Sequence, residues 1–128
     1  MIEVAEKSVL WLRFHVRGIQ THASIPERGR NAHKAASFLA VRLDALHKVF
    51  RKRDPMFSPP ISTFEPTKRE ANVPNINTIP GEDVMYFDCR VLPDYKVSEV
   101  MREVKRIAKE VEQQFKVKIG ISSPNSGQ

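Results

Sequence analysis

Ser8-Val-Leu-Trp-Leu-Arg-Phe-His-Val-Arg17 is the stretch that indicates the fold, because apolar side chains recur at every second position along it. These apolar positions are Leu10, Leu12, Phe14 and Val16. Successive side chains of a β-strand point to opposite faces of a sheet, so the alternation predicts a strand with one buried face. A sheet that is buried on one face needs a second layer packed against it.

Five more segments show a regular apolar pattern beyond this strand. They are a helix over residues 32–51 with Asn31 as its N-cap, an edge strand at 61–65 between prolines, a strand at 84–92, a helix over 98–115 and a strand at 116–121. The order β-α-β-β-α-β predicts an α+β, ferredoxin-like sandwich, in which two helices cover one face of a four-stranded antiparallel sheet.

The composition is that of a single globular domain over residues 1–128, with 41% hydrophobic and 28% charged residues. No apolar run reaches the roughly 18 residues that a membrane span needs. The N-terminal Met1-Ile-Glu-Val-Ala-Glu-Lys7 contains acids and has no apolar core, so a secretory signal peptide is not expected. Cys89 is the single cysteine, which excludes an internal disulfide and favours a cytoplasmic setting.

The helix predicted over residues 32–51 has two apolar stripes, although packing on a sheet requires only one. One stripe consists of Ala35, Leu39, Leu43, Leu46 and Phe50, and the other consists of Phe38, Val41, Ala45 and Val49. We expect the second stripe to be covered by something outside the fold, either a twin subunit or another domain. The alternative is that one broad stripe lies within a single core.

The net charge of +6 is confined to residues 1–54, which hold 11 Lys and Arg against 5 Asp and Glu, whereas residues 55–128 hold 10 of each. A basic ferredoxin-like domain can be an RNA-binding module, and this is the alternative function. Such a module needs exposed aromatic rings on its central strands, where Tyr86 and Trp11 are the candidates. Solvated helix faces account for the same charge, so no nucleic-acid partner is predicted.

Compact catalytic motifs such as His-Glu-x-x-His, the phosphate-binding loop and Gly-x-Ser-x-Gly do not occur in the sequence. The histidines, His15, His22, His33 and His47, are spread over a predicted strand, loop and helix. No set of carboxylates accompanies them locally, so we expect no metal site within this chain. A small-molecule regulatory domain of the same topology has no sequence feature in its favour.

Two blocks of sequence carry a more specific signature. The first is Gly18-Ile-Gln-Thr-His-Ala-Ser-Ile-Pro-Glu-Arg-Gly-Arg-Asn-Ala32, and the second is Asn77-Thr-Ile-Pro-Gly81 followed by Asp88-Cys-Arg90. Together they resemble the dimerisation (lid) domain of a family of zinc-dependent amide hydrolases. This family includes aminoacylase, carboxypeptidase G, acetylornithine deacetylase and succinyl-diaminopimelate desuccinylase. Glu6-Lys-Ser8 resembles the family's Glu-Lys-Gly lead-in, with Ser8 in place of glycine, so the resemblance covers residues 5–122.

The resemblance implies roles for three side chains. His22 matches a lid histidine that acts at the partner subunit's metal site, where it stabilises the oxyanion formed during amide hydrolysis. Arg90 matches the arginine that binds the substrate carboxylate, and Asn77 matches an asparagine that hydrogen-bonds the substrate near the histidine. From the residues alone, His22 is a surface histidine, Arg90 an ion-pair partner of Asp88 and Asn77 a turn residue, and these alternatives stay open.

The resemblance also implies a homodimer through this domain, a substrate that is an N-acyl amino acid or a peptide, and zinc or cobalt in a catalytic domain. The family's metal ligands and general base lie before and after the lid, in segments that have no counterpart in these 128 residues. We therefore expect the chain, which ends in the linker-like Ser122-Ser-Pro-Asn-Ser-Gly-Gln128, to be an inactive fragment of such an enzyme. No membrane partner is expected.

Overall fold

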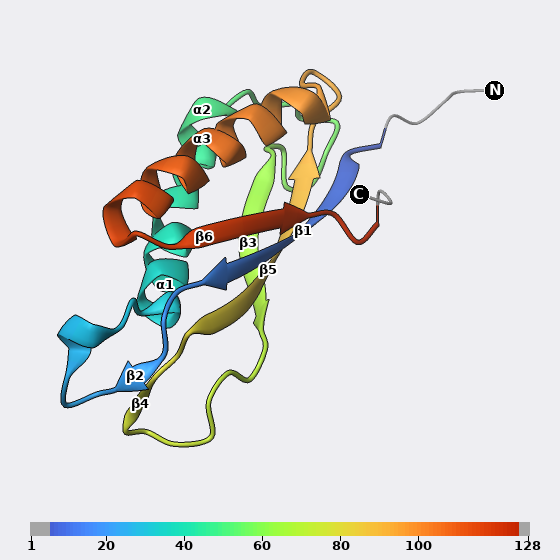
Figure 1. The fold of residues 1–128 in the computed structure, drawn as a ribbon. Helices are drawn as coiled ribbons and strands as arrows, with labels where there is room; N and C mark the ends of the chain where they lie inside the picture. The colour runs from blue at the N-terminus through green and yellow to red at the C-terminus, as the bar shows by residue number, and fades with distance from the viewer. Residues whose placement is uncertain (1–5, 126–128) are drawn as a thin grey trace.

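The sheet predicted from the alternating pattern is present in the computed structural model, which describes residues 6–125 (Figure 1). Its strands are β1 (Ser8–Arg17), β3 (Thr63–Arg69), β5 (Glu82–Val91) and β6 (Lys118–Ser122). They lie in the order β3-β5-β1-β6, and each neighbouring pair is antiparallel. The predicted ferredoxin-like fold is therefore confirmed.

The helices α1 (Ala32–Leu43), α2 (Leu46–Val49) and α3 (Val97–Phe115) cover one face of this sheet (Figure 1). At the start of α1, the side-chain oxygen of Asn31 accepts a hydrogen bond from the Lys34 N–H at 2.9 Å, which confirms the predicted N-cap. At the end of α3, Lys116 adopts a left-handed φ of 57° and turns the chain back toward β6.

The core lies between the sheet and the helices and uses the strand faces that the alternation identified. Phe14 of β1 and Phe87 of β5 are at most 2% exposed, and their rings meet edge to face with centroids 5.6 Å apart. Cys89 lies in the same core face of β5. Its burial raises the pKa of the thiol to about 12, so the thiol stays protonated near neutral pH.

The prediction of one continuous first helix is wrong, because the chain tightens before α2 and divides the helix into α1 and α2. At the break, the Ala45 N–H donates to the carbonyl of Arg42, three residues earlier, instead of four. Beyond the break, the Nε2 atom of His47 accepts a hydrogen bond from the Phe64 N–H of β3 at 3.1 Å. The hydrogen bond of His47, which follows the break, thus joins the helix layer to the edge of the sheet.

The second apolar stripe of this helical segment faces away from the core. Val41 is 73% exposed and Val49 is 47% exposed, and Ala45 is also exposed. Phe38 alone of the stripe is half-buried, against the ring of Phe115 with centroids 5.3 Å apart. The alternative of a single broad core is therefore wrong for this stripe, and the exposed side chains are available to a partner.

Strand β3 is an edge strand, as predicted from its flanking prolines, but it runs from Thr63 to Arg69. Pro66 lies within it, and a β-bulge follows between Pro66 and Lys68. Proline has no N–H to donate, so a strand with a neighbour on one side only can accommodate it.

A short ladder pairs β2 (Thr21–His22) with β4 (Thr78–Ile79), in two segments for which the sequence predicts loops. Two residues are too few to show any periodicity, so this pairing could not be predicted from the pattern. The 3₁₀ turn η1 (Pro26–Arg28) connects this region to α1. Within residues 6–125 no helix is long and apolar enough to cross a membrane.

Candidate functional site

The ladder of β2 and β4 brings together two of the three predicted site residues. His22 lies opposite Thr78, which is the neighbour of Asn77. The N–H of Ala23 also donates a hydrogen bond to the Asn77 carbonyl at 2.8 Å. The two signature blocks, which contain His22 and Asn77 at positions 55 residues apart in sequence, therefore meet at this ladder.

Close packing at the end of β1 allows these loops to approach each other. The N–H of Gly18 donates to the carbonyl of Gly81 at 2.7 Å. A Cβ atom added to Gly18 would lie 2.0 Å from the carbonyl oxygen of Arg30, which is far inside contact distance. Any side chain at Gly18 would push the loops apart, so this glycine has a structural role.

His22 is exposed, and a neighbouring residue determines which of its ring nitrogens carries the proton. The Nδ1 atom accepts the backbone N–H of Ser24 at 3.1 Å and lies 2.7 Å from the Ser24 hydroxyl. A nitrogen that accepts a hydrogen bond is unprotonated, so the neutral imidazole carries its proton on Nε2. No other residue in 6–125 bonds to this Nε2, so the exposed edge of His22 is a free hydrogen-bond donor.

Asn77 is exposed beside His22, at the end of a turn. The Thr78 N–H closes this turn on the carbonyl of Asn75 at 3.4 Å, and the Thr78 hydroxyl donates to the Asn77 side-chain oxygen at 3.3 Å. The interpretation of Asn77 as a turn residue is thus correct for the backbone. The side-chain NH₂ group has no partner in the described part of the chain, so it can still donate to a ligand.

Arg90 is 46% exposed and forms the ion pair with Asp88 that the residues alone predict. Its Nε and Nη2 atoms donate to the two carboxylate oxygens of Asp88 at 2.7 and 2.9 Å. These hydrogen bonds lower the pKa of the Asp88 carboxyl and raise the pKa of the guanidinium. The Trp11 indole N–H donates to the same carboxylate at 3.0 Å. Among the described residues, no other side chain bonds to the edge of the guanidinium formed by Nη1 and Nη2, so this edge can donate to a second carboxylate.

Arg90 lies at the other end of the sheet from His22 and Asn77. Strand β5 begins at Glu82, close to the ladder, and reaches Arg90 eight residues later. At about 3.3 Å per residue, this separation is roughly 26 Å. Figure 1 shows the ladder at one end of the domain and the tip of β5 at the other. One chain therefore does not place all three predicted residues in one site.

A surface groove of about 500 Å³ runs beside Arg90 and is also lined by Lys7. The Lys7 ammonium donates to the carbonyls of Pro59 and Ile61 at 2.8 and 2.7 Å, which fixes it at the groove. Desolvation by burial and the nearby Arg90 charge lower the pKa of Lys7. Glu6 also lines this groove, so two cations and one acid border it, and the net positive charge favours an anionic ligand there.

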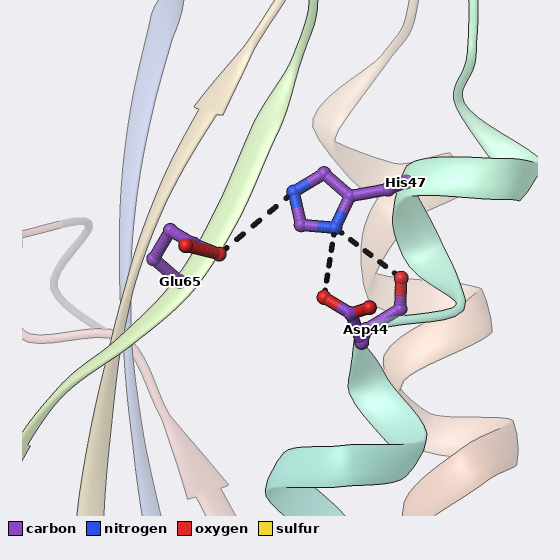
Figure 2. A group of neighbouring side chains, drawn as sticks. All are labelled: Asp44, His47 and Glu65. Carbon is purple, nitrogen blue, oxygen red and sulfur yellow. Dashed lines mark hydrogen bonds and ion pairs between the residues drawn. The ribbon is translucent and has the colours of Figure 1, made fainter.

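Asp44, His47 and Glu65 form the group within residues 6–125 that comes closest to a metal site (Figure 2). The imidazole of His47 already has protein partners on both sides. Its Nε2 accepts the Phe64 N–H, and its Nδ1 lies 3.2 Å from both the carbonyl and a carboxylate oxygen of Asp44. A metal ion would need the unprotonated Nε2 and would leave the Phe64 N–H without an acceptor. These residues do not suit a metal ion, and they fasten the corner between α1 and α2 to β3.

Asp83 is a buried carboxylate that motif reasoning misses. It is 1% exposed and accepts hydrogen bonds from Arg69 at 2.9 Å and from Asn72 at 3.1 Å. The alternation along the strand could have revealed it, because every second residue points to the same face and Asp83 therefore shares the apolar face with Met85 and Phe87. A carboxylate on such a face requires buried hydrogen-bond partners.

The domain therefore exposes a histidine and an arginine at opposite ends and an apolar stripe on its helices. Residues 4–116 match the model of the peptidase dimerisation domain family. The chain belongs to this family, as the two signature blocks predicted.

Two relatives are named as metallohydrolases. The one from Methanococcus maripaludis is 46% identical over 105 residues, and the one from Methanocaldococcus jannaschii is 42% identical over 112 residues. These matches cover 81% and 87% of this chain but 25% and 27% of the relatives. The chain thus spans about a quarter of the length of these metallohydrolases.

Solved structures with the same fold include an amidase and an aminobenzoyl-glutamate utilization protein. An amidase of the hydantoinase/carbamoylase family from Burkholderia ambifaria has a TM-score of 0.79 at 19% identity, covering 94% of this chain and 28% of that one. An aminobenzoyl-glutamate utilization protein from Klebsiella pneumoniae has a TM-score of 0.71 at 17% identity, covering 92% and 28%. At these identities, the similarity establishes the fold.

Proposed function

We propose that the chain is the lid and dimerisation domain of a larger metal-dependent hydrolase that cleaves amide bonds. The substrate class is an N-acyl amino acid or a peptide, as in a deacylase, a desuccinylase or a carboxypeptidase. Family membership and the metallohydrolase relatives support this proposal. The metal, zinc or cobalt, belongs to a catalytic domain outside these residues, so the chain alone has no activity.

The observation that carries the proposal is the fixed tautomer of His22. Its Ser24-bonded Nδ1 leaves Nε2–H as an exposed donor beside the free amide of Asn77. Amide hydrolysis develops negative charge on the carbonyl oxygen, and a pre-oriented donor stabilises that charge. In this role His22 donates from Nε2 to the oxyanion, and Asn77 donates to the same substrate. The metal supplies the activated water when it is bound.

We propose that Arg90 binds the substrate carboxylate while it keeps its ion pair with Asp88. Asp88 occupies the Nε–Nη2 edge of the guanidinium and so orients the planar fork. The other edge can then form two parallel hydrogen bonds with a carboxylate. The second cation of the groove, Lys7, adds favourable charge for that anion.

His22 and Arg90 serve different subunits' sites in this proposal, because roughly 26 Å of strand separates the two ends of β5. The first and last parts of the described chain both lie near Arg90. Ser8 pairs with Val91, and Asn125 bonds to the backbone of Trp11. Flanking catalytic segments therefore join the domain at the Arg90 end. Arg90 thus acts in its own subunit, and His22 with Asn77 reaches the partner's site.

The proposed dimer forms through the exposed stripe of Val41, Ala45 and Val49. An apolar stripe can pair with its own copy across a two-fold axis, since such an interface needs only one self-complementary patch. The edge of β3 is less open to a second strand. His47 already occupies the N–H of Phe64, and Pro66 has no N–H to offer. The helix stripe is therefore the main contact in the proposal.

The RNA-binding alternative gains no support from the open face of the sheet. Trp11 is 46% exposed and Tyr86 is half-buried there. However, the indole N–H bonds to Asp88 and the Tyr86 hydroxyl bonds to Glu70. Carboxylates at the tips of both rings repel the phosphates that an RNA would bring.

The test of the proposed function is an assay of the complete hydrolase on N-acyl amino acids and dipeptides, each compared with its carboxamide analogue. We expect cleavage of the acids, a large preference over the amides, loss of activity with a chelator and recovery with zinc or cobalt. Activity that survives exhaustive chelation, or equal cleavage of acid and amide forms, would contradict the proposal.

A further inference from the structure

Asp83 is a buried carboxylate that the proposed chemistry does not use, although it lies at the same end of the sheet as the His22 ladder. It pairs with Val16 of β1 in the sheet, only one residue from the start of β5, and is 1% exposed. Removing an ionised carboxylate from water is unfavourable unless hydrogen bonds and opposite charge replace the water. The surroundings of Asp83 therefore have to supply both.

Hydrogen-bond donors from three different elements surround Asp83. Arg69, at the end of β3, reaches it from Nε at 2.9 Å and from Nη2 at 2.7 Å, and the His33 ring in the first turn of α1 lies 3.4 Å away. Asn72, in the loop after β3, donates from its side-chain amide at 3.1 Å. The guanidinium of Arg69 also donates to the Ser37 hydroxyl at 3.1 Å. The carboxylate thus joins β3, β5, α1 and the loop over residues 70–77.

Asn72 connects this network to the candidate site. Its amide NH₂ is bound to Asp83, and its side-chain oxygen accepts the N–H of Val73 at 2.6 Å, so both ends of one amide are engaged. Val73 continues through the loop to Asn77, whose carbonyl is bonded to the chain next to His22. A displacement of the loop would therefore move Asn77 and strain the ladder that holds His22.

We propose that Asp83 is a positioning residue that holds the 70–77 loop through Asn72, so that Asn77 and His22 keep a fixed spacing. Its effect on catalysis rests on the proposed function, whereas the anchoring is a property of this chain alone. A catalytic donor must stay within about 0.5 Å of its productive position, and a mobile loop cannot hold a donor that closely. Asp83 supplies a buried anchor outside the site.

The first test measures anchoring in the chain itself by amide hydrogen exchange. Asn72→Ala removes the link to the loop and leaves the pair of Asp83 and Arg69 intact. We expect exchange at the Ala23 N–H, which bonds to the Asn77 carbonyl, to speed up by about tenfold, as for the loss of one hydrogen bond to a charged group. The Val117 N–H, bonded at the far end of α3, should be unchanged.

Ser37→Ala is the matched control, because it removes a different hydrogen bond of the same network. It should leave exchange at Ala23 unchanged. Equal exchange at Ala23 in the wild type and in Asn72→Ala would overturn the anchoring. So would equal acceleration by the two variants, since the network would then be a general stabiliser.

The second test measures turnover in the complete hydrolase. Asn72→Ala should lower kcat about tenfold with KM and metal content unchanged, whereas Ser37→Ala should change neither constant. In an Asn77→Ala/His22→Ala background, Asn72→Ala should have no further effect on kcat, because the groups that it positions are gone. Asp83→Asn, which keeps the shape but loses the charge, should lie between the wild type and Asn72→Ala.

The two proposals fail in distinguishable ways. If His22→Ala and Asn77→Ala lower kcat but Asn72→Ala does not, the positioning role of Asp83 is wrong and the proposed function stands. If His22→Ala and Asn77→Ala leave kcat unchanged, the proposed function is wrong, and the exchange measurement still decides the anchoring. A full effect of Asn72→Ala in the background that lacks both site residues would show a purely structural role.

Discussion

The two ends of strand β5 differ in how the side chains proposed to act in function are held. At the ladder end, His22 and Asn77 sit on loops and leave an imidazole N–H and an amide NH₂ without partners in the described chain. At the other end, Arg90 sits on a paired strand, and Asp88 occupies one edge of its guanidinium. The ladder end is suited to reach outward, and the strand end is suited to hold an anion in a fixed orientation.

This difference supports the proposed dimer, in which each end of the domain contributes to a different site. The length of β5 separates the ends by roughly 26 Å, which is too far for side chains at both ends of one chain to contact one small substrate together. Two copies related by a two-fold axis can place the ladder end of one beside the Arg90 end of the other. Each end, and the contact between the copies, can be tested separately.

The largest expected effect belongs to His22. Replacing His22 by Ala in the complete hydrolase should lower kcat ~10²–10³-fold, or about 3–4 kcal/mol, because it removes one oxyanion donor. Metal content should not change, since His22 is not proposed as a ligand. His15→Ala is the control, because His15 is bonded to Glu82 on the open face of the sheet. Equal turnover of His22→Ala and the wild type would make His22 a loop residue only.

The contact between copies should be the next most sensitive feature. Val41→Asp places a charge in the exposed stripe of both subunits, so the dissociation constant of the dimer should rise by ~10²-fold or more. Met56→Asp is the control, because Met56 is a similarly exposed apolar residue at 76%. Light scattering over a range of concentrations measures both. If Val41→Asp changes the dissociation constant no more than Met56→Asp does, the dimer interface does not include this stripe.

At the other end, Arg90→Lys keeps the charge but loses the planar fork. We expect KM for an N-acyl amino acid to rise about tenfold or more, with kcat less affected, because two parallel hydrogen bonds are lost. Arg106→Lys is the matched control, since Arg106 is also an exposed arginine paired with carboxylates, on α3. An unchanged KM in Arg90→Lys would leave Arg90 as a partner of Asp88 alone.

The smallest effect concerns pH. Hydrogen bonds from Arg90 lower the pKa of Asp88, so the pair stabilises the fold above the ordinary pKa of an aspartate, and this stability is lost as the pH falls through the lowered value. In Arg90→Gln, the Asp88 carboxyl should titrate at a higher pH than in the wild type, as followed by carboxyl carbon NMR. The same titration midpoint in both proteins would contradict the pairing.

The alternation of residues 8–17 and 84–92 was enough to predict the sheet, because apolar side chains at every second position are characteristic of a half-buried strand. The exposure of Val41 and Val49 also followed from counting stripes on one helix. The break before α2 and the β2–β4 ladder could not be predicted, since they depend on contacts with residues far away in sequence. The burial of Asp83 was predictable in principle, because its position in the alternation places it on the apolar face of the strand.

The resemblance in sequence predicted His22, Asn77 and Arg90 together and assigned His22 to the partner's site, but it gave no distance between His22 and Arg90 within one chain. The separation of the two ends follows from the length of β5, which is a property of the folded chain. The Ser24 contacts that set the tautomer of His22 likewise depend on the local turn after β2. The sequence therefore predicted the candidate residues, which stay a prediction, and the fold shows that one chain divides them between two ends of the sheet.

Mixing two inactive variants of the complete hydrolase tests the central claim most directly, that His22 and Arg90 serve different subunits' sites. A hybrid dimer contains one His22→Ala subunit and one Arg90→Ala subunit. One of its two sites has both wild-type side chains only if one of the two residues acts in its own subunit and the other acts in the partner's site. A random mixture should then recover about a quarter of wild-type activity, because half of the dimers are hybrids with one complete site. If the mixture stays as inactive as its components although hybrids form, both residues act on the same side and the claim is contradicted.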